Sequence, residues 1–240
     1  MRKVLFALAL LFALMALLPA TAESQANGPD IPRQGQVALG VTGGMAQPLG
    51  QLGRAIALEG SSAASGLNLD RGISGRAYAD YHVTQRFALG GFVCAARSYM
   101  KDVSVTRESG TRTYERLLEG RTTQLGLYAK YFLPQRGAWS SYVLGGAAHV
   151  DRKTQLAPEV ALLYPGTSVF EVRDDRLGFV GGLGSDYAWN DRLSLGVVAL
   201  LDYSGPLAHD FPWMGEGHDV NDWSFLTLQA GVSWHLGVGM

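Results

Sequence analysis

The residues best suited to chemistry gather in a short stretch near residue 205. Asp202, Ser204, His209 and Asp210 offer a hydroxyl, an imidazole and two carboxylates. These are the groups that a serine hydrolase combines as nucleophile, base and orienting acid. No known nucleophile motif surrounds Ser204, and solvated polar residues at the start of a loop explain the same pattern. We therefore expect no enzyme here, with a hydrolase that uses Ser204 and His209 as an alternative.

The other candidate sites are weaker. His209, His218 and Asp219 do not have the spacing of a zinc site. The run from Gly181 to Gly184 is superficially similar to a phosphate-binding loop, but it lies inside a predicted strand with no helix after it. Cys94 is the single cysteine, so it cannot form an internal disulfide, and we expect it to fill space. The sequence predicts no metal and no cofactor.

Further ionisable residues occur within segments that alternate between apolar and small or polar residues. Eight such segments follow residue 36, and this period of two is typical of β-strands. They span residues 36–45, 73–83, 87–95, 121–133, 142–150, 177–189, 193–203 and 226–236. Most are about 9–13 residues long, whereas strands of soluble proteins usually have roughly 5–6. A tilted strand that crosses a bilayer needs about 9–11 residues. The lengths favour a membrane barrel.

Each strand is expected to turn its apolar row outward. In the segment 121–133, Leu125, Leu127 and Tyr131 alternate with Gln124 and Lys130. The same rule assigns an outward direction to the row Tyr142, Leu144, Ala148 and Val150. The inward rows are rich in small residues and carry ionisable side chains, which are Arg76, Asp80, His82, Lys130, His149, Asp186 and Asp202. Partly desolvated charges need partners, so we expect Arg76 or Lys130 to pair with Asp80, Asp186 or Asp202.

The connections alternate between short and long. Three are short, at residues 84–86, 134–140 and 190–191, and four are long, at about residues 47–70, 99–120, 151–174 and 205–221. Outer-membrane barrels have short turns on one rim and long loops on the other. The fold class that we predict is all-β, an eight-stranded antiparallel up-and-down transmembrane β-barrel.

Aromatic residues cluster near the ends of these strands. A girdle of aromatic side chains at the membrane–water interface is typical of outer-membrane barrels. At the short-turn ends, the predicted girdle consists of Tyr81, Phe87, Tyr131, Trp139, Tyr187, Trp189 and Trp234, and Tyr99, Tyr203, Trp223 and Phe225 mark the opposite ends.

The N-terminus has the features of a secretory signal peptide. Arg2 and Lys3 precede an apolar run from residue 4 to residue 18, and Ala20-Thr21-Ala22 supplies a cleavage site. The predicted domains are a signal peptide at 1–22, a flexible lead-in at 23–35 and the barrel at 36–240. The balance of 20 basic against 21 acidic residues gives no basic surface for nucleic acid. The predicted location is the bacterial outer membrane.

Two strand–turn–strand segments resemble a known family. Residues 77–92, AYADYHVTQRFALGGF, and residues 186–196, DYAWNDRLSLG, share an aromatic-bearing strand, a tight polar turn and a second strand containing glycine. They are similar to the small outer-membrane β-barrel family of OmpA/OmpX/OmpW-like proteins. The resemblance covers residues 36–240. It implies a fold and a location rather than an activity, because the group includes structural, adhesive, channel and enzymatic members.

The resulting functional expectation is a structural or surface-interaction protein, or a passive route for small solutes, with a narrow and largely plugged lumen. A second hypothesis is an OmpW-like channel for hydrophobic compounds, with mouth contacts from Phe211, Trp213 and Trp223. A third is the lipid-modifying hydrolase, and a fourth is a soluble secreted barrel of lipocalin type. The expected partners are outer-membrane lipids, the barrel-assembly machinery, periplasmic chaperones and a small or hydrophobic solute. We expect a monomer.

Overall fold

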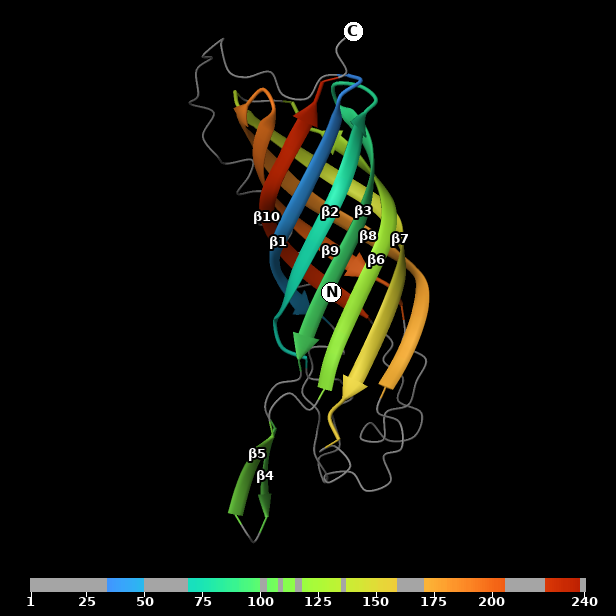
Figure 1. Cartoon of the computed structure of the whole chain (residues 1–240), viewed down its shortest axis with the longest axis vertical. Helices are drawn as coiled ribbons and strands as arrows, with labels where there is room; N and C mark the ends of the chain where they lie inside the picture. Colours follow the sequence, from blue (N-terminus) through green and yellow to red (C-terminus); the bar gives the residue numbers. More distant parts are fainter. Residues whose placement is uncertain are drawn as a thin grey trace.

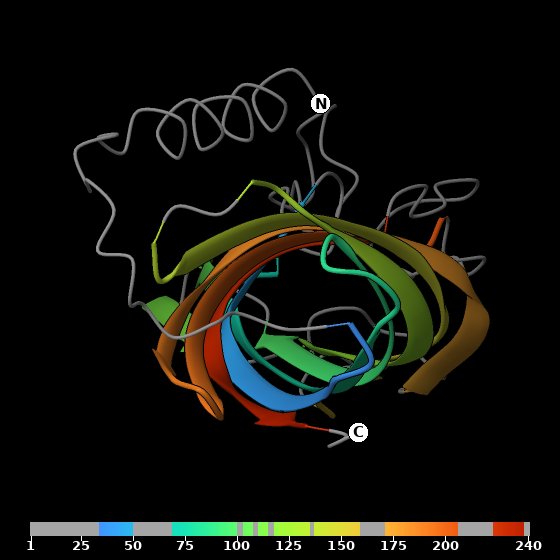
Figure 2. The ribbon, with the colours of Figure 1, turned by 90° about the horizontal axis from the view of Figure 1, so that it is seen from above.

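The protein forms a closed antiparallel β-barrel in a computed structural model (Figure 1). The structure describes residues 34–49, 69–99, 103–107, 110–114, 118–134, 137–158, 171–205 and 223–237. The neighbouring strands around the barrel are β1-β10-β9-β8-β7-β6-β3-β2, and β1 closes the ring by pairing with both β10 and β2. Figure 2 shows this ring from above. The predicted eight-stranded barrel is confirmed.

Each predicted strand corresponds to one strand of the barrel. The eight strands are β1 (Val37–Pro48), β2 (Gly72–His82), β3 (Phe87–Tyr99), β6 (Leu118–Phe132), β7 (Trp139–Leu156), β8 (Glu171–Asn190), β9 (Leu193–Tyr203) and β10 (Ser224–Leu236). Within the described ranges, no helix is long and apolar enough to cross a membrane.

Apolar side chains cover the outside of the barrel. Leu127 is 73% exposed, and Ile73 is 71% exposed. Other large apolar residues on the outside include Val41, Met45, Leu89, Val93, Leu125, Leu177, Phe179, Val197 and Leu228. In a water-soluble protein such a surface would be an extensive interaction patch. On a barrel that spans a bilayer it is the lipid-facing belt.

The predicted girdle residues lie at the short-turn ends of their strands. Tyr81, Tyr131, Trp139, Trp189 and Trp234 are exposed, whereas Phe87 and Tyr187 are half-buried. The rings of Trp139 and Tyr187 pack together with centroids 5.1 Å apart. At the opposite ends, Trp223 and Phe225 are buried, so their predicted placement on the outer surface is wrong.

The predicted direction of one strand is also wrong. In β7 the apolar row of Tyr142, Leu144, Ala148 and Val150 points into the barrel, and His149 is on the outside. Both rows of this strand contain apolar and small residues, so hydrophobicity alone does not distinguish its two faces. Pairing with β6 decides the direction, because Val150 lies opposite the buried Gln124.

Local side-chain chemistry explains the short turns. Asn190 Oδ1 accepts hydrogen bonds from the backbone N–H groups of Arg192 and Leu193, each at 2.9 Å, which folds the β8–β9 turn. In the β6–β7 connection, Gly137 has a φ of 63°, a conformation that glycine adopts without steric cost.

The structure adds two features to the long connections. A hairpin of β4 (Val103–Arg107) and β5 (Gly110–Tyr114) lies beyond the end of the barrel (Figure 1). Strands β7 and β8 also continue past their predicted ends and pair as far as Gln155 and Glu171. The extension carries alternating charged residues rather than an apolar row, so the sequence pattern of a membrane strand stops before the strand does.

Candidate functional site

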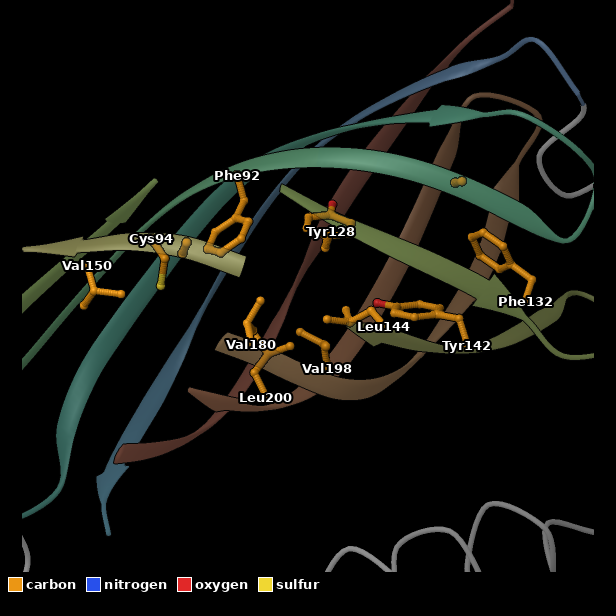
Figure 3. Packing of buried hydrophobic residues seen from close by; sticks show 12 residues of the cluster. Phe92, Cys94, Tyr128, Phe132, Tyr142, Leu144, Val150, Val180, Val198 and Leu200 are labelled. Atoms are coloured by element: carbon orange, nitrogen blue, oxygen red, sulfur yellow. The ribbon is translucent and has the colours of Figure 1, made fainter. Parts of the chain in front are cut away.

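The inside of the barrel has an apolar side and a polar side. The apolar side comes from β3, β6, β7, β8 and β9 and is shown in Figure 3. It consists of Ala88, Phe92, Cys94, Tyr128, Phe132, Tyr142, Leu144, Ala148, Val150, Val180, Val198 and Leu200. The polar side includes a chain of hydrogen bonds from Thr42 through Gln229 to Ser74, with lengths of 2.7 and 3.0 Å. Side chains from all parts of the wall therefore fill the interior.

A buried ion pair lies inside the barrel near the short-turn end, where it joins β2 and β6 over the intervening β3. Lys130 Nζ lies 2.5 Å from Asp80 Oδ2, and both side chains are almost fully buried. Tyr128 donates its hydroxyl hydrogen to the other carboxylate oxygen. The ammonium group also lies 4.6 Å from the ring centroid of Tyr78 and 4.7 Å from that of Tyr142. The charge of Lys130 is thus compensated by one carboxylate and by aromatic faces.

Arg76 occupies the interior further along β2. Its guanidinium carbon lies 4.2 Å from the ring centroid of Phe92 and 4.6 Å from that of Tyr128. Asp202, from the far wall, interacts with Gln124 by a hydrogen bond and with Arg76 electrostatically. Opposite charges therefore also interact deeper in the barrel, without a direct ion pair between Arg76 and Asp202 among the described contacts.

Two of the three remaining ionisable residues that were predicted to face inward, His82 and Asp186, lie near the first ion pair. His82 packs on Phe132 with ring centroids 5.3 Å apart. Asp186 is partly exposed and interacts electrostatically with Lys130. The structure therefore brings six of the seven predicted inward residues into the interior. His149, also predicted there, is outside and faces Asp175 at 3.7 Å.

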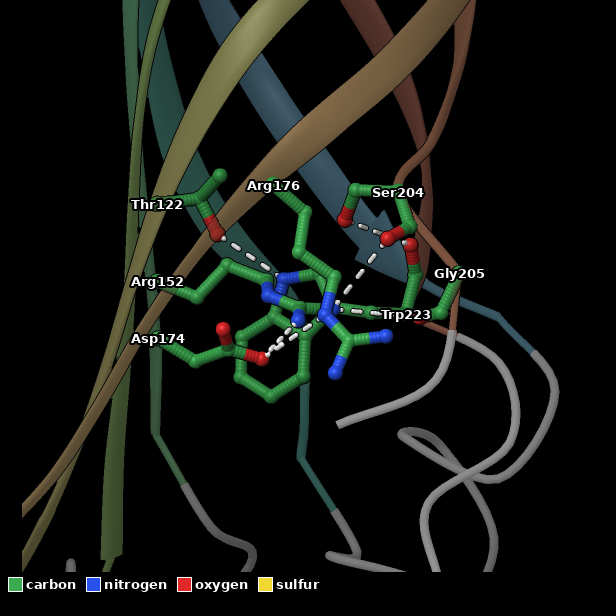
Figure 4. A network of polar contacts seen from close by, with 7 residues as sticks. All are labelled: Thr122, Arg152, Asp174, Arg176, Ser204, Gly205 and Trp223. Atoms are coloured by element: carbon green, nitrogen blue, oxygen red, sulfur yellow. Dashed lines mark hydrogen bonds and ion pairs between the residues drawn. The ribbon is translucent and has the colours of Figure 1, made fainter. Parts of the chain in front are cut away.

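The opposite end of the interior is covered by a polar latch around Trp223, which Figure 4 shows. Trp223 is 1% exposed and donates its indole N–H to Thr122 Oγ1 at 3.1 Å. Arg152 donates from Nη1 to the carbonyl oxygens of Ser204 and Gly205, and it pairs through Nη2 with Asp174. The guanidinium group of Arg152 lies 5.6 Å from the Trp223 ring centroid. We call this set, Thr122, Arg152, Asp174, Ser204, Gly205 and Trp223, the mouth latch.

The mouth latch joins strands that are distant in the sequence. Backbone hydrogen bonds of 3.1 Å connect Ser204 N to Trp223 O and Trp223 N to Gly205 O. Leu69 and Leu118 are buried at the same end, and Gly120 lies against both Leu69 and Trp223. Burial lowers the pKa of Arg152, and the neighbouring Asp174 carboxylate opposes this shift. At this end of the barrel, the buried cation of Arg152 therefore lies beside the apolar ring of Trp223, with the buried Leu69 and Leu118 nearby.

Comparison with known proteins identifies the family. Residues 6–235 match the model of the outer membrane protein beta-barrel domain. This chain belongs to that family. The structure is similar to that of Neisserial surface protein A, with 14% sequence identity over 85% of this chain and 99% of that chain and a TM-score of 0.49. No curated protein matches the sequence.

Two further solved structures are similar at the same level. The outer membrane protein OprG from Pseudomonas aeruginosa has 16% identity, covers 87% of this chain and 100% of its own, and gives a TM-score of 0.46. The outer membrane protease OmpT from Escherichia coli has 7% identity, covers 91% and 100%, and gives 0.43. Membership of the outer membrane protein beta-barrel domain family shows the fold and leaves the activity open.

Within this family fold, the hydrolase candidates have other contacts. Ser204 is buried, and its hydroxyl donates to the carbonyl oxygen of Trp223 at 3.4 Å. Asp202 faces Gln124 in the interior. The proposed base, His209, lies outside the described residues, as do the mouth residues Phe211 and Trp213. Trp223 belongs to the latch. Among the described residues, no group of three His, Cys, Asp or Glu side chains could hold a metal ion.

One polar pair was not predicted from the sequence. Ser194 Oγ and His235 Nε2 lie 2.8 Å apart inside the short-turn end of the barrel. Ser194 is opposite Ser233 in the pairing of β9 with β10, which places His235 diagonally across from it. Only the strand register reveals this pair, because 41 positions separate the two residues in the chain. Ser194 is only 2% exposed, so its hydrogen bond with His235 is one that stabilises the fold.

Proposed function

We propose that this protein is exported to the bacterial outer membrane and spans it as a closed, non-enzymatic barrel. In this proposal the barrel holds its long connections at the cell surface for interaction, and its narrow, plugged interior conducts neither ions nor larger solutes. It inserts with the help of the barrel-assembly machinery and periplasmic chaperones, and it works as a monomer surrounded by outer-membrane lipids.

The outer surface supports the insertion. Exposed apolar residues such as Leu127, Val93 and Leu228 occur on strands all around the barrel, and aromatic residues lie at one end of this belt. A closed sheet satisfies the backbone hydrogen bonds that lipid cannot satisfy. A water-soluble barrel of lipocalin type would present polar residues at these positions, so the exposed apolar rows favour the membrane.

The contents of the interior support a blocked lumen. An eight-stranded barrel leaves room only for side chains or one small ligand. Here the buried pair of Lys130 and Asp80, which joins β6 and β2 over the intervening β3, lies toward one end, and the mouth latch lies toward the other. This combination is the observation that carries the proposal: side chains are buried at two separate levels of the interior.

Two measurements test the proposal. Outer-membrane fractionation followed by gel electrophoresis with and without boiling should show a membrane-associated protein whose mobility changes on boiling. In planar bilayers the wild-type protein should give no steady open-channel current. Trp223→Ala alone opens only the mouth level and serves as the matched control, which should stay closed. Trp223→Ala combined with Asp80→Ala and Lys130→Ala shortens side chains at both levels and should raise the current.

Recovery of the wild-type protein in the soluble periplasmic extract would contradict membrane insertion. A steady wild-type current, or a combined variant whose current is no higher than that of Trp223→Ala alone, would contradict the blocked lumen.

A further inference from the structure

Three arginines lie on the outer surface at the edge of the apolar belt. Arg71 precedes β2, Arg97 is near the end of β3, and Arg121 is near the start of β6. We call them the arginine patch. The girdle residues at the other ends of these strands are Tyr81, Phe87 and Tyr131, which makes the separation ten positions in each case.

This separation matches the thickness of a bilayer core. Ten positions of a strand rise about 34 Å at roughly 3.4 Å per residue. With a tilt of about 40°, the distance along the membrane normal is about 26 Å, compared with an apolar band about 25 Å tall in outer-membrane barrels. The arginine patch therefore lies at the level of the lipid headgroups, on the rim that carries the long connections.

A single acidic side chain organises two of the arginines. Arg97 and Arg121 are directly opposite each other in the pairing of β3 with β6. Like charges in this position are destabilising. Glu119 compensates, because it contacts Arg97 through Nε and Nη2 at 2.6 and 2.7 Å, and Arg121 Nε contacts the same carboxylate. Two guanidinium groups that share one carboxylate keep a net positive charge.

The exposure of these side chains is unequal. The side chain of Glu119 is 15% exposed, whereas those of Arg97 and Arg121 are 42% and 48% exposed. Burial by itself would raise the pKa of Glu119, but the hydrogen bonds from both arginines outweigh burial and hold it below its ordinary value. The carboxylate is thus a fixed, ionised base beneath two more exposed guanidinium groups.

Arg71 extends the arginine patch to the neighbouring strand. The hydrogen bond of 2.7 Å from Asp70 N to Tyr99 O joins the beginning of β2 to the end of β3. Arg71 Nε donates to Gln47 Oε1 at 3.2 Å, which is a neutral partner. The guanidinium group of Arg97 also lies 4.9 Å from the Tyr99 ring centroid.

Charged residues on the extended strands are paired differently. Arg173 pairs with Asp151, and Lys153 pairs with Glu171 at 2.9 Å. Each of these cations has its own carboxylate, so this region is locally neutral. It is also further from the girdle, because Arg173 is sixteen positions from Trp189. Among the described residues of this row, in which Lys153 lies opposite Arg121, the cations of β7 and β8 are therefore each matched by a carboxylate, whereas the arginine patch keeps an excess of positive charge.

We infer that the arginine patch binds the phosphate group of a lipid in the outer leaflet, with the acyl chains of that lipid against Ile73, Val93 and Leu125. Guanidinium groups bind phosphate through paired hydrogen bonds, and these charge-assisted bonds are strong. The three apolar residues are exposed on the same strands directly below the arginines. A lipid presents both groups at the required distance, whereas free phosphate presents only one. This inference rests on the proposed membrane insertion.

Native mass spectrometry of the full-length barrel in detergent tests the inference. The probes are diphosphoryl lipid A and the neutral glycolipid digalactosyldiacylglycerol. Wild-type protein should retain lipid A and release the neutral lipid. The double variant Arg97→Gln/Arg121→Gln should lose retention of lipid A by roughly tenfold or more, as expected when charge-assisted hydrogen bonds are removed. The matched control Arg173→Gln removes an arginine that has its own carboxylate partner, Asp151, and should retain lipid A like the wild type.

The outcomes are separable. A folded barrel, shown by the boiling-dependent mobility shift, that retains both lipids equally overturns the inference and leaves the proposed function intact. Equal retention of lipid A by the double variant also overturns it. Complete displacement of lipid A by millimolar inorganic phosphate would identify a free-phosphate site instead. A wild-type protein that shows no shift and does not insert into vesicles would remove the proposed function and the lipid site together.

Discussion

Removal of Lys130 should destabilise the barrel strongly, because Asp80 would remain buried without its cation. The Nζ–Oδ2 distance is 2.5 Å, and the side chains are only 4% and 3% exposed. At this separation Coulomb's law with an effective dielectric constant of about 20 gives an attraction of roughly 6–7 kcal/mol. Most of this attraction offsets the cost of desolvating the two charges, and the loss of one partner of a buried pair usually costs about 3–5 kcal/mol.

For Lys130→Met we expect a loss of about 3 kcal/mol in the free energy of unfolding, at the lower end of that range. The hydroxyl of Tyr128 continues to donate a hydrogen bond to the Asp80 carboxylate. The methionine side chain also keeps contact with the rings of Tyr78 and Tyr142. Both contacts reduce the penalty.

Urea unfolding in lipid vesicles, followed by tryptophan fluorescence and by gel mobility, measures this loss. The double variant Asp80→Asn/Lys130→Met removes both charges and should recover most of the stability. The control Arg173→Gln breaks an exposed ion pair and should change stability little. The reasoning is refuted if Lys130→Met unfolds at the wild-type urea concentration, or if the double variant is as unstable as the single one.

Three further outcomes follow from the packing and the charges. Gly146→Ala should lower the free energy of unfolding by roughly 1–3 kcal/mol or more, because a Cβ at this position would lie 2.1 Å from the carbonyl oxygen of Leu127. A Cβ at the adjacent Gly145 meets nothing within 4 Å, so the control Gly145→Ala should leave urea unfolding unchanged. Glu119→Gln should be less stable than wild type at pH 7. The difference should shrink once the pH falls below the ordinary glutamate pKa of about 4.3 and disappear below the lowered pKa of Glu119, because the carboxylate loses its stabilising effect when it is protonated. Trp223→Ala combined with Asp80→Ala and Lys130→Ala should raise bilayer current relative to Trp223→Ala alone.

Sequence patterning predicted most of the barrel because the alternation has a direct physical cause. In β6 the outward row of Leu125, Leu127 and Tyr131 is clearly more apolar than the inward row containing Gln124 and Lys130. The direction of the side chains in one such strand shows which face is inside and which is outside. Seven further strands of similar length can then avoid free edges in the membrane only by closing into a barrel.

The pattern failed where both rows of a strand have similar polarity. β7 places Tyr142 and Leu144 inside, opposite small residues such as Gly145 outside. Its direction depends on register with β6, which a single sequence does not specify. The extension of β7 and β8 was missed for a related reason: beyond the membrane, ion pairs such as that of Asp151 with Arg173 replace the apolar row.

The candidate site was predictable in its residue types but not in its pairs. Alternation placed Lys130 and Asp80 on inward rows, but their contact joins strands that are 50 positions apart. The mouth latch depends on the same kind of information, because Arg152 reaches the backbone of Ser204 and Gly205 from another strand. Register and barrel closure bring these groups together.

The most direct measurement concerns the medium around the outward residues. A nitroxide label at Leu127→Cys, in a Cys94→Ser background, reports its surroundings in lipid vesicles through collisions with oxygen, which dissolves in lipid, or with a water-soluble nickel complex. Leu127 is on the apolar exterior, so its label should collide with oxygen and not with nickel. A label at Lys153, beyond the belt, should show the reverse. Frequent nickel collisions at position 127 would contradict the membrane-spanning barrel.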